Sequence, residues 1–103
     1  MFPASMRTRV KVESQVESFV KSLAPHPRRR LTQAIKALAH DKGEIKRLEG
    51  KLEGYSRLRV AGHRVIFLER AERSERIIDC VFAEKRAVVY ELFVKLVSEG
   101  LSG

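Results

Sequence analysis

Alternating apolar and polar positions predict two strands joined by a tight turn in the segment YSRLRVAGHRVIF, residues 55–67. The Ala-Gly pair at 61–62 is a two-residue connection of the kind that closes β-hairpins. If the turn comprises only that pair, Arg59 lies directly opposite Arg64. Because side chains alternate between the two faces of a strand, one face carries a set that suits a core. That set is Ser56, Leu58, Val60, His63, Val65 and Phe67.

The other face of this hairpin is rich in arginine, and we expect it to face solvent. It holds Tyr55, Arg57, Arg59, Arg64, Ile66 and Leu68. Like charges directly opposite each other destabilise a sheet, so the facing Arg59 and Arg64 break a local rule. Such violations are expected where a site serves another purpose. A bound anion would resolve the conflict, and the face is therefore predicted to be an anion site.

The periodicity of the N-terminal half predicts one strand and two helices. Residues 6–12 alternate as a strand does, after a loose leader at residues 1–5. Apolar residues at helical spacing then predict a first helix, which the two prolines at 25–27 end as they start a second. The apolar positions of the two helices are Val16, Phe19, Val20, Leu23, Leu31, Ile35 and Leu38.

In the C-terminal half, the segment at 43–54 is a charged linker by composition, and 70–76 is a polar turn. Residues 77–83 are nearly all apolar and predict a central strand, and a last helix is predicted from about Lys85. The whole chain, residues 1–103, is predicted to be a single α+β domain of β-α-α-β-β-β-α order. Its small antiparallel sheet would pack against the N-terminal helical hairpin.

Charge adds a class of partner to this picture. The 103 residues include 21 Lys and Arg against 13 Asp and Glu, a net charge of +8. Such a balance favours nucleic acid, an anionic membrane or an acidic protein as partner. No apolar run reaches the length of a transmembrane helix and no secretory signal is evident, so the expected location is the cytoplasm. Cys80 is the one cysteine, and no metal-ligand spacing or cofactor motif is present.

Two residues near the last helix extend the candidate site. If that helix starts at Lys85 or Arg86, Arg86 and Tyr90 lie one turn apart on one face. Arginine binds phosphate through two parallel hydrogen bonds, and an aromatic ring can stack on an unpaired base. Taken singly, Tyr90 also suits a packing role and Arg57 a solvated edge position. His63 points to the core face in this register and is predicted to be structural.

The runs RLEGKLEGYSRLRVAGHRVIF (47–67) and CVFAEKRAVVY (80–90) resemble the RelE/ParE superfamily of toxins from bacterial toxin–antitoxin modules. In that family a Leu-x-Gly segment precedes one strand, a Gly-[Tyr/His]-Arg-[Val/Leu]-Ile-[Tyr/Phe] strand follows, and a Lys/His-Arg-x-x-x-Tyr motif opens the terminal helix. The element order matches as well, so the resemblance extends over nearly the whole chain from Met6.

The resemblance implies a ribosome-dependent endoribonuclease that inhibits translation. In the RelE branch, a 2′-hydroxyl of mRNA in the ribosomal A site attacks the adjacent phosphate without a metal ion. By motif, Arg64, Arg86 and Tyr90 would be catalytic. Arg57 and Arg59 occupy a strand that supplies lysines in well-studied members, and arginine is a poor general base. Arg57, Arg59, Lys51 and Lys85 are therefore the predicted RNA and phosphate contacts, with Lys51 and Lys85 as the candidate bases.

Two other functions remain open from the sequence. ParE-branch toxins share the fold but inhibit DNA gyrase without being nucleases, and a disarmed homologue would only bind antitoxin. In every case the resemblance implies a cognate antitoxin and a hetero-oligomer. The wide apolar band of the last helix, with Leu92, Phe93, Leu96 and Val97, is the predicted antitoxin contact.

Overall fold

The computed structural model describes residues 7–85 and 89–99, in which five strands form a sheet of order β1-β5-β4-β3-β2. The elements are β1 (Arg7–Val12), α1 (Ser14–Lys21), α2 (Pro25–Ala37), η1 (Leu38–His40), β2 (Glu44–Arg47), η2 (Gly50–Leu52), β3 (Ser56–Val60), β4 (His63–Glu72), β5 (Glu75–Lys85) and α3 (Val89–Ser98). The predicted α+β class and the predicted order of helices and strands are confirmed, with β2 as an addition. The predicted leader at 1–5 lies outside the described residues.

The sheet is mixed rather than purely antiparallel. β2, β3, β4 and β5 form antiparallel pairs, whereas β1 runs parallel to β5 with Arg7 opposite Glu75. Parallel neighbours need a long connection, and here most of the chain separates β1 from β5. The expected hairpin register is confirmed, because Arg59 pairs with Arg64 around the turn at 61–62.

β2 lies where a linker was predicted. All four of its residues are exposed, and it forms one edge of the sheet beside β3. A strand that buries neither face has no reason to alternate apolar and polar side chains, so periodicity gave no signal for it. Its effect on the site is direct, because it brings Glu44 opposite Arg59.

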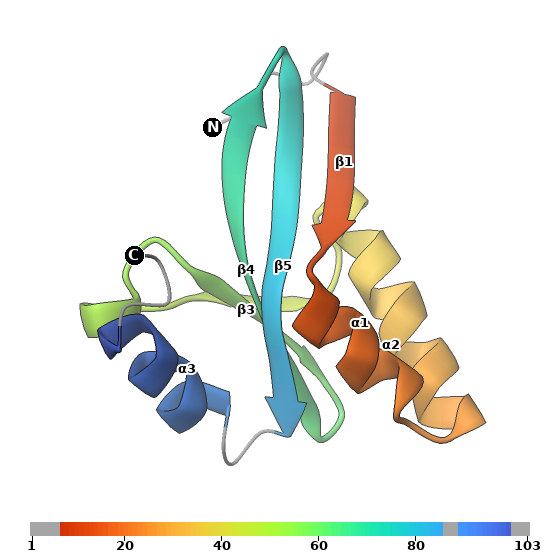
Figure 1. Cartoon of the computed structure of the whole chain (residues 1–103). Helices are drawn as coiled ribbons and strands as arrows, with labels where there is room; N and C mark the ends of the chain where they lie inside the picture. Colours follow the sequence, from red (N-terminus) through yellow and green to blue (C-terminus); the bar gives the residue numbers. More distant parts are fainter. Residues whose placement is uncertain (1–6, 86–88, 100–103) are drawn as a thin grey trace.

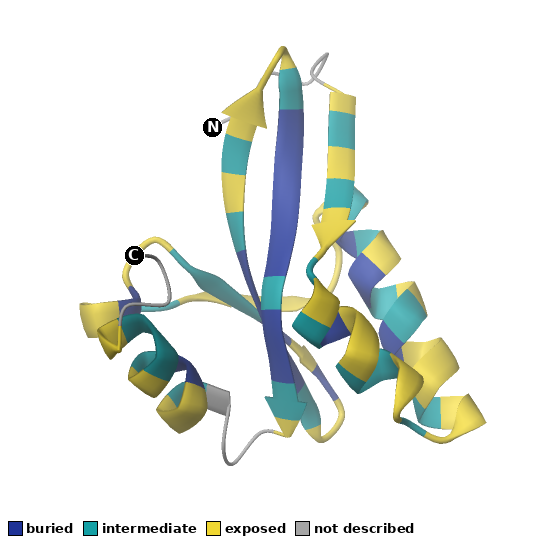
Figure 2. Cartoon of the chain, in the orientation of Figure 1, coloured by how far each residue is buried: buried dark blue, intermediate teal, exposed yellow. Residues whose placement is uncertain are grey.

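α1 and α2 cover one face of the sheet, to the right of β4 and β5 in Figure 1. The larger hydrophobic cluster lies between them and the strands, and the apolar positions predicted for both helices join it. Its buried members are Val16, Leu31, Ile35, Leu38, Leu58, Val60, Val65, Phe67, Ile78, Cys80 and Ala83. Figure 2 shows this burial as dark blue stripes on the strands and on the inner sides of both helices.

α3 lies on the left of the sheet in Figure 1 and packs over a smaller cluster of Leu52, Ile66, Phe82 and Phe93. The sequence predicted that the arginine-rich face of the hairpin faces solvent. In the structure part of this face is buried instead. Ile66 on that face is fully buried, and Arg64 is only 8% exposed. Lys85 is the last residue of β5, so the last helix does not begin at Lys85 as predicted, and its described part is α3 from Val89.

A β-bulge in β5 lets one apolar run serve both clusters. Ile66 pairs with Phe82 but Phe67 pairs with Cys80, so Val81 is an extra residue. The insertion resets the alternation of side chains along the strand. Phe82 therefore joins the cluster under α3, and Ala83 joins the cluster under α1 and α2.

The edge of β5 beyond β1 is closed by a side chain. The last β1 pair is Val12 with Cys80. Further along β5, the side-chain amide of Gln15 forms hydrogen bonds with the strand in place of a β1 residue. Gln15 Nε2 donates to the Ala83 carbonyl at 2.8 Å, and Ala83 N–H donates to Gln15 Oε1 at 2.8 Å. This pair of hydrogen bonds ties α1 to β5 next to the candidate site.

An ion-pair network ties the projecting β4–β5 hairpin to the end of η1. Arg76 Nη1 donates to Asp41 Oδ2 at 3.2 Å, and the same guanidinium also pairs with Glu69. Asp41 has a φ of 56° as it ends η1, a conformation that Asp and Asn tolerate better than most residues. The hydrogen bond from Arg76 lowers the pKa of the Asp41 carboxyl.

Candidate functional site

Four charged residues form a row across four strands, here named the arginine row. Cross-strand pairing sets Glu44 of β2 opposite Arg59 of β3, Arg59 opposite Arg64 of β4, and Arg64 opposite Glu84 of β5. Directly opposite residues share a face of the sheet. The two arginines that broke the local rule are therefore flanked on both sides by carboxylates.

The two arginines of this row already have partners within the protein. Arg59 Nη1 lies 3.3 Å from Glu44 Oε1, an exposed ion pair. Arg64 Nη1 donates to the carbonyl oxygens of Ala61 at 3.2 Å and His63 at 3.0 Å. Internal groups thus relieve much of the Arg59–Arg64 conflict, and the binding of an anion at this face stays a prediction. Arg64 Nε and Nη2 donate no hydrogen bond to the described residues, so they remain available to a ligand.

Arg57 lies two residues before Arg59 on the same face, and its guanidinium has fewer hydrogen-bond partners. Its neighbours in the register are Lys46 on β2 and Ile66 on β4. The side chain is half-buried, and Nη1 is buried without a hydrogen-bond partner among the described residues. An unmade buried hydrogen bond costs free energy, more so for a charged group. Arg57 therefore keeps hydrogen-bonding capacity that the described residues do not use.

α3 brings Tyr90 to the same face. Tyr90 lies in the first turn of the helix, half-buried against the cluster that contains Ile66 and Phe82. The Ile66–Phe82 pair is one register step from the Arg64–Glu84 pair, so the cluster that Tyr90 joins borders the arginine row. Arg86, predicted to lie one turn before Tyr90, falls outside the described residues.

Neither lysine named as a candidate base is brought to this site. Lys85 stands opposite His63, so it belongs to the face that α1 and α2 cover. Lys51 lies in η2, which precedes β3, whereas Arg59 is at the far end of β3. In Figure 1 η2 lies at the left beside the end of α3, away from the β3–β4 turn.

His63 packs against the core, as its position in the pattern predicted, and Cys80 is buried in the core. The His63 ring is half-buried and meets Phe19 edge-on, with the ring centroids 5.6 Å apart. Cys80 is fully buried, and burial raises the pKa of its thiol to about 12. A thiol of that pKa is protonated at neutral pH and is a poor nucleophile. Within the described ranges, no three His, Cys, Asp or Glu side chains gather into a metal-binding group.

Glu44 and Glu84 are the members of the site that sequence reasoning missed. Glu84 is half-buried, and its Oε2 accepts a hydrogen bond from Lys85 N–H. Extending the Arg59–Arg64 register onto the next strand could have found it. Nothing comparable existed for Glu44, because β2 itself had no periodic signal.

The four residues predicted to contact an antitoxin differ in exposure. Leu92 is 40% exposed, whereas Phe93 is 1% exposed and packs against Tyr55 and Phe82. Leu96 and Val97 are half-buried against the smaller cluster. Phe93 is thus a core residue in this structure, and Leu92 is the member that a partner could contact without rearrangement of α3.

No family model and no curated protein matches the chain. Solved structures do match. The archaeal RelE–RelB complex from Pyrococcus horikoshii has 26% identity and a TM-score of 0.60, covering 79% of this chain and 97% of that one. The RelB–RelE antitoxin–toxin complex from Methanococcus jannaschii has 19% identity and a TM-score of 0.56, covering 81% and 98%. A YoeB/ParE toxin from Agrobacterium tumefaciens has 16% identity and a TM-score of 0.60, covering 76% and 98%.

These matches define the class of protein. The chain has the fold of the RelE/ParE superfamily of toxins, and the resemblance seen in residues 47–67 and 80–90 is confirmed. Among the described residues, no helix is both long and apolar enough to cross a membrane.

Proposed function

We propose that this protein is the toxin of a toxin–antitoxin module. We further propose that the sheet face carrying Arg57, Arg59 and Arg64, here named the arginine face, cleaves mRNA on the ribosome. The observation that carries the proposal is the gathering of Arg57, Arg59 and Arg64 on one face beside Tyr90, with Arg57 Nη1 buried and unpartnered. The similarity to RelE proteins solved as complexes with RelB supports the toxin role.

The reaction that suits these groups is attack of an RNA 2′-hydroxyl on the adjacent phosphate. Negative charge grows on the non-bridging phosphate oxygens as the new bond forms. Donors held in place for that charge supply the largest usual part of such catalysis. The guanidinium of Arg57 and the Nε and Nη2 groups of Arg64 would donate to those oxygens, and Tyr90 would stack on a neighbouring base.

Proton transfer is the weaker part of this site. Arginine stays protonated near neutral pH, so Arg57, Arg59 and Arg64 are clamps rather than bases. Lys51 and Lys85 lie away from the row, and Arg86 stays a catalytic residue only as the resemblance implies. A site with strong clamps and no evident base gains most from a substrate whose 2′-hydroxyl is already in line. We therefore expect slow cutting of free RNA and fast cutting of mRNA held by a ribosome.

Inhibition of DNA gyrase, as in the ParE branch, is the second candidate function. One observation favours it: Glu44 and Glu84 flank Arg59 and Arg64, and a row of two acids and two arginines has little net attraction for phosphate. Arg57 and its neighbour Lys46 have no acidic partner among the described residues. These two cations would attract phosphate, so we favour RNA cleavage over gyrase inhibition.

A cognate antitoxin is the proposed partner in the cytoplasm, in a toxin–antitoxin hetero-oligomer. Its apolar anchor would cover Leu92, the exposed large hydrophobic residue of α3, and extend over the half-buried Leu96 and Val97. An acidic segment would then reach the arginine face, since opposite charges speed association while apolar anchors prolong the complex.

Induction in cells separates the two candidate functions. Wild-type protein should stop bulk translation while plasmid supercoiling stays normal. The Arg64→Ala variant should restore translation, and Arg73→Ala, which removes an exposed arginine at the β4–β5 turn, should remain toxic. Loss of supercoiling with translation intact would assign the protein to the ParE class instead.

A further inference from the structure

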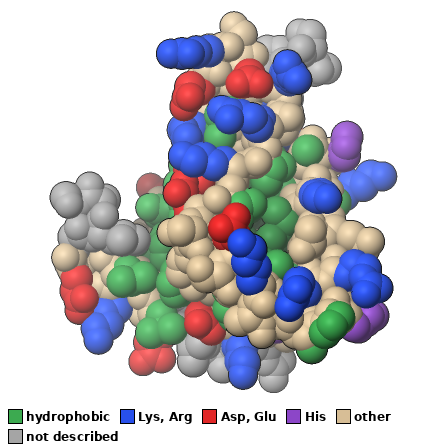
Figure 3. Space-filling model, turned by 45° about the vertical axis from the view of Figure 1, so that its right-hand side comes forward, with side chains coloured by type: hydrophobic (Ala, Val, Ile, Leu, Met, Phe, Trp, Pro, Cys, Tyr) green, Lys and Arg blue, Asp and Glu red, His purple; other side chains and the backbone are tan. Residues whose placement is uncertain are grey.

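The outward face of α2 is strongly basic and lies apart from the arginine face. α2 carries Arg28, Arg29, Arg30 and Lys36, and no Asp or Glu. It packs its Leu31 side against the sheet face opposite to the one that α3 covers. Lys and Arg side chains are spread over the side of the molecule that α1 and α2 form (Figure 3). A ligand on this surface would therefore not occupy the candidate active site.

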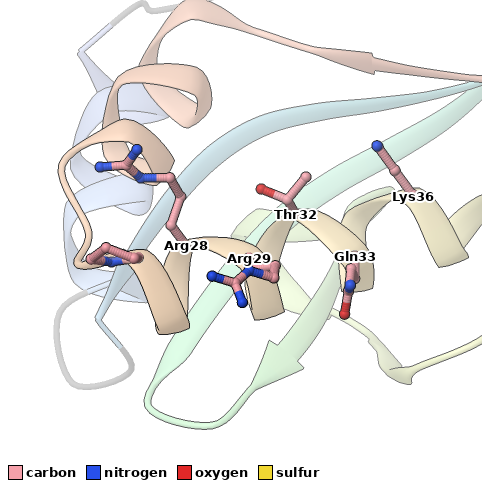
Figure 4. A pocket seen from close by; sticks show the side chains of 6 residues that line it. Arg28, Arg29, Thr32, Gln33 and Lys36 are labelled. Atoms are coloured by element: carbon pink, nitrogen blue, oxygen red, sulfur yellow. The ribbon is translucent and has the colours of Figure 1, made fainter.

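A hollow of about 420 Å³ lies along this outward face. Its lining is Pro25, Arg28, Arg29, Thr32, Gln33 and Lys36. In Figure 4 Thr32 and Lys36 point to one side of the helix, and Arg29 and Gln33 to the other. The surface between them is bordered by cations and neutral hydrogen-bonding groups.

Arg28 has a structural task that separates it from the other cations. Its Nη2 donates to the carbonyl oxygens of Lys21 at 3.1 Å and Leu23 at 3.0 Å, and its Nε also donates to Leu23. These carbonyls lie at and just beyond the end of α1, where backbone acceptors lack helical partners. Arg28 therefore joins α1 to α2 and forms a fixed wall of the hollow.

Arg29 and Lys36 have no such commitment. Within the described ranges, no carboxylate lies at ion-pair distance from either, in contrast to Arg59 and Arg76. Seven residues of helix separate them, about 10.5 Å along the axis. Two long cationic side chains at that spacing can reach different phosphates of one backbone, and Thr32 and Gln33 between them add neutral donors and acceptors.

The lining favours nucleic acid over an acidic protein. Protein interfaces draw most of their affinity from buried apolar and aromatic anchors. In the described part of the chain, the exposed large hydrophobic residues are Val12, Ile45 and Leu92, and none of them is on α2. Contacts to phosphate and sugar need only cations, hydroxyls and amides.

We propose that the α2 hollow binds the phosphate backbone of structured RNA, as a second RNA contact separate from the message at the arginine face. The choice of RNA rests on the proposed function, and the Thr32 hydroxyl and Gln33 amide suit the 2′-hydroxyls displayed in the shallow groove of an A-form duplex. The two contacts would hold the protein against a folded RNA while the arginine face engages a single strand.

The test measures binding of a short RNA duplex over a range of salt, in an Arg64→Ala background that cannot cleave. The probing variant is Arg29→Glu with Lys36→Glu. The matched control is Arg30→Glu with Arg73→Glu, which changes net charge by the same amount. Arg30 lies about 200° around the helix from Thr32, and Arg73 lies at the β4–β5 turn. Thermal melting checks that both double variants remain folded.

The probing variant should lose roughly tenfold in affinity at low salt, and its salt slope should fall by about two, while the control stays within about twofold of the parent. Equal losses in both variants, or no binding by the parent, would overturn the proposal. Equal binding of a DNA duplex would overturn the choice of RNA. If the probing variant keeps RNA affinity but loses binding to a polyglutamate peptide, the hollow is an acidic-protein site instead. The assay needs no cleavage, so its failure is distinct from failure of the proposed function.

Discussion

The two faces of the sheet are built on different principles. Under α1 and α2, eleven buried residues form a continuous apolar cluster. Under α3, four buried residues form a much smaller cluster, and Arg57, Arg59 and Arg64 share that face. The first face supplies most of the hydrophobic stabilisation, because that term grows with the apolar area removed from water. The second face exposes charged groups at the margin of a small helix.

The proposed site lies on the less covered face. Arg57 and Tyr90 are both half-buried there, so each is held by packing yet open to a ligand. The bulge at Val81 links the two faces, because it lets β5 supply Cys80 and Ala83 to one cluster and Phe82 to the other. If the comparison is right, the faces should respond differently to the same kind of change.

Truncation of a buried side chain should have the largest effect on the free energy of unfolding. The part of the fold that it loosens should differ between the two faces. Leu31→Ala should lower the free energy of unfolding by about 2–5 kcal/mol, because a fully buried leucine leaves a cavity. Phe93→Ala removes the ring contacts to Tyr55 and Phe82, and should release α3 while the sheet persists. Urea unfolding with amide hydrogen exchange measures both. Equal loss of protection across the sheet in the two variants would contradict the division.

The Gln15 clamp, the pair of hydrogen bonds that ties α1 to β5, should be the next most sensitive feature. Gln15→Met leaves the Ala83 N–H and carbonyl without their partners, and should cost about 1–3 kcal/mol of unfolding free energy. Gln15→Glu keeps an acceptor for the Ala83 N–H but loses the donor, so it should fall between wild type and Gln15→Met. Chemical denaturation of the three proteins gives the ranking, and an unchanged Gln15→Met midpoint would refute the clamp.

Acid should weaken the connection between η1 and the β4–β5 hairpin. Because the hydrogen bond from Arg76 lowers the pKa of Asp41, this pair stabilises the fold above the ordinary carboxyl pKa and is lost as pH falls through the folded-state value. The exposed position of Asp41 limits the effect to about 1 kcal/mol. Asp41→Asn keeps the backbone conformation and should flatten the pH dependence of the melting temperature between neutral pH and pH 3. A variant that follows the wild-type curve would show that Asp41 is not the group responsible.

Removal of the carboxylate beside Arg59 should have the smallest effect, and it should strengthen RNA binding rather than weaken the protein. Glu44→Gln frees Arg59 from its 3.3 Å ion pair and should tighten binding of single-stranded RNA by roughly two- to fivefold. Glu17→Gln is the matched control, since Glu17 forms a similar exposed pair with Lys21 on α1. RNA titrations at constant salt compare the two, and equal gains would reflect net charge rather than the site.

The face under α1 and α2 could be predicted from the sequence because its residues repeat at strand and helix periods. Val16, Leu31, Leu58 and Val65 all lie where the pattern placed them. The parallel pairing of β1 could not be predicted, because pairing partners far apart in sequence leave no local signal. β2 was missed because it buries neither face, and Glu44 was missed with it.

The candidate site was predicted in part. The facing arginines followed from the two-residue turn at 61–62, and the pairing of Arg59 with Arg64 is confirmed. The burial of Arg64 and Phe93 depends on tertiary packing rather than on periodicity, so the pattern did not predict it. Lys85 was assigned to the wrong element because the end of an apolar strand and the start of a helix look alike over a few residues.

The central claim is that the arginine face cleaves ribosome-bound mRNA, and Arg57 tests it most directly. Purified wild-type, Arg57→Ala and Arg73→Ala proteins are added to a translating extract, and message ends are mapped by primer extension. We expect cuts within ribosome-bound codons for wild type and Arg73→Ala, little cutting of the same RNA without ribosomes, and a rate at least about 100-fold lower for Arg57→Ala. Intact messages with the wild-type protein, or undiminished cutting by a folded Arg57→Ala variant, would contradict it.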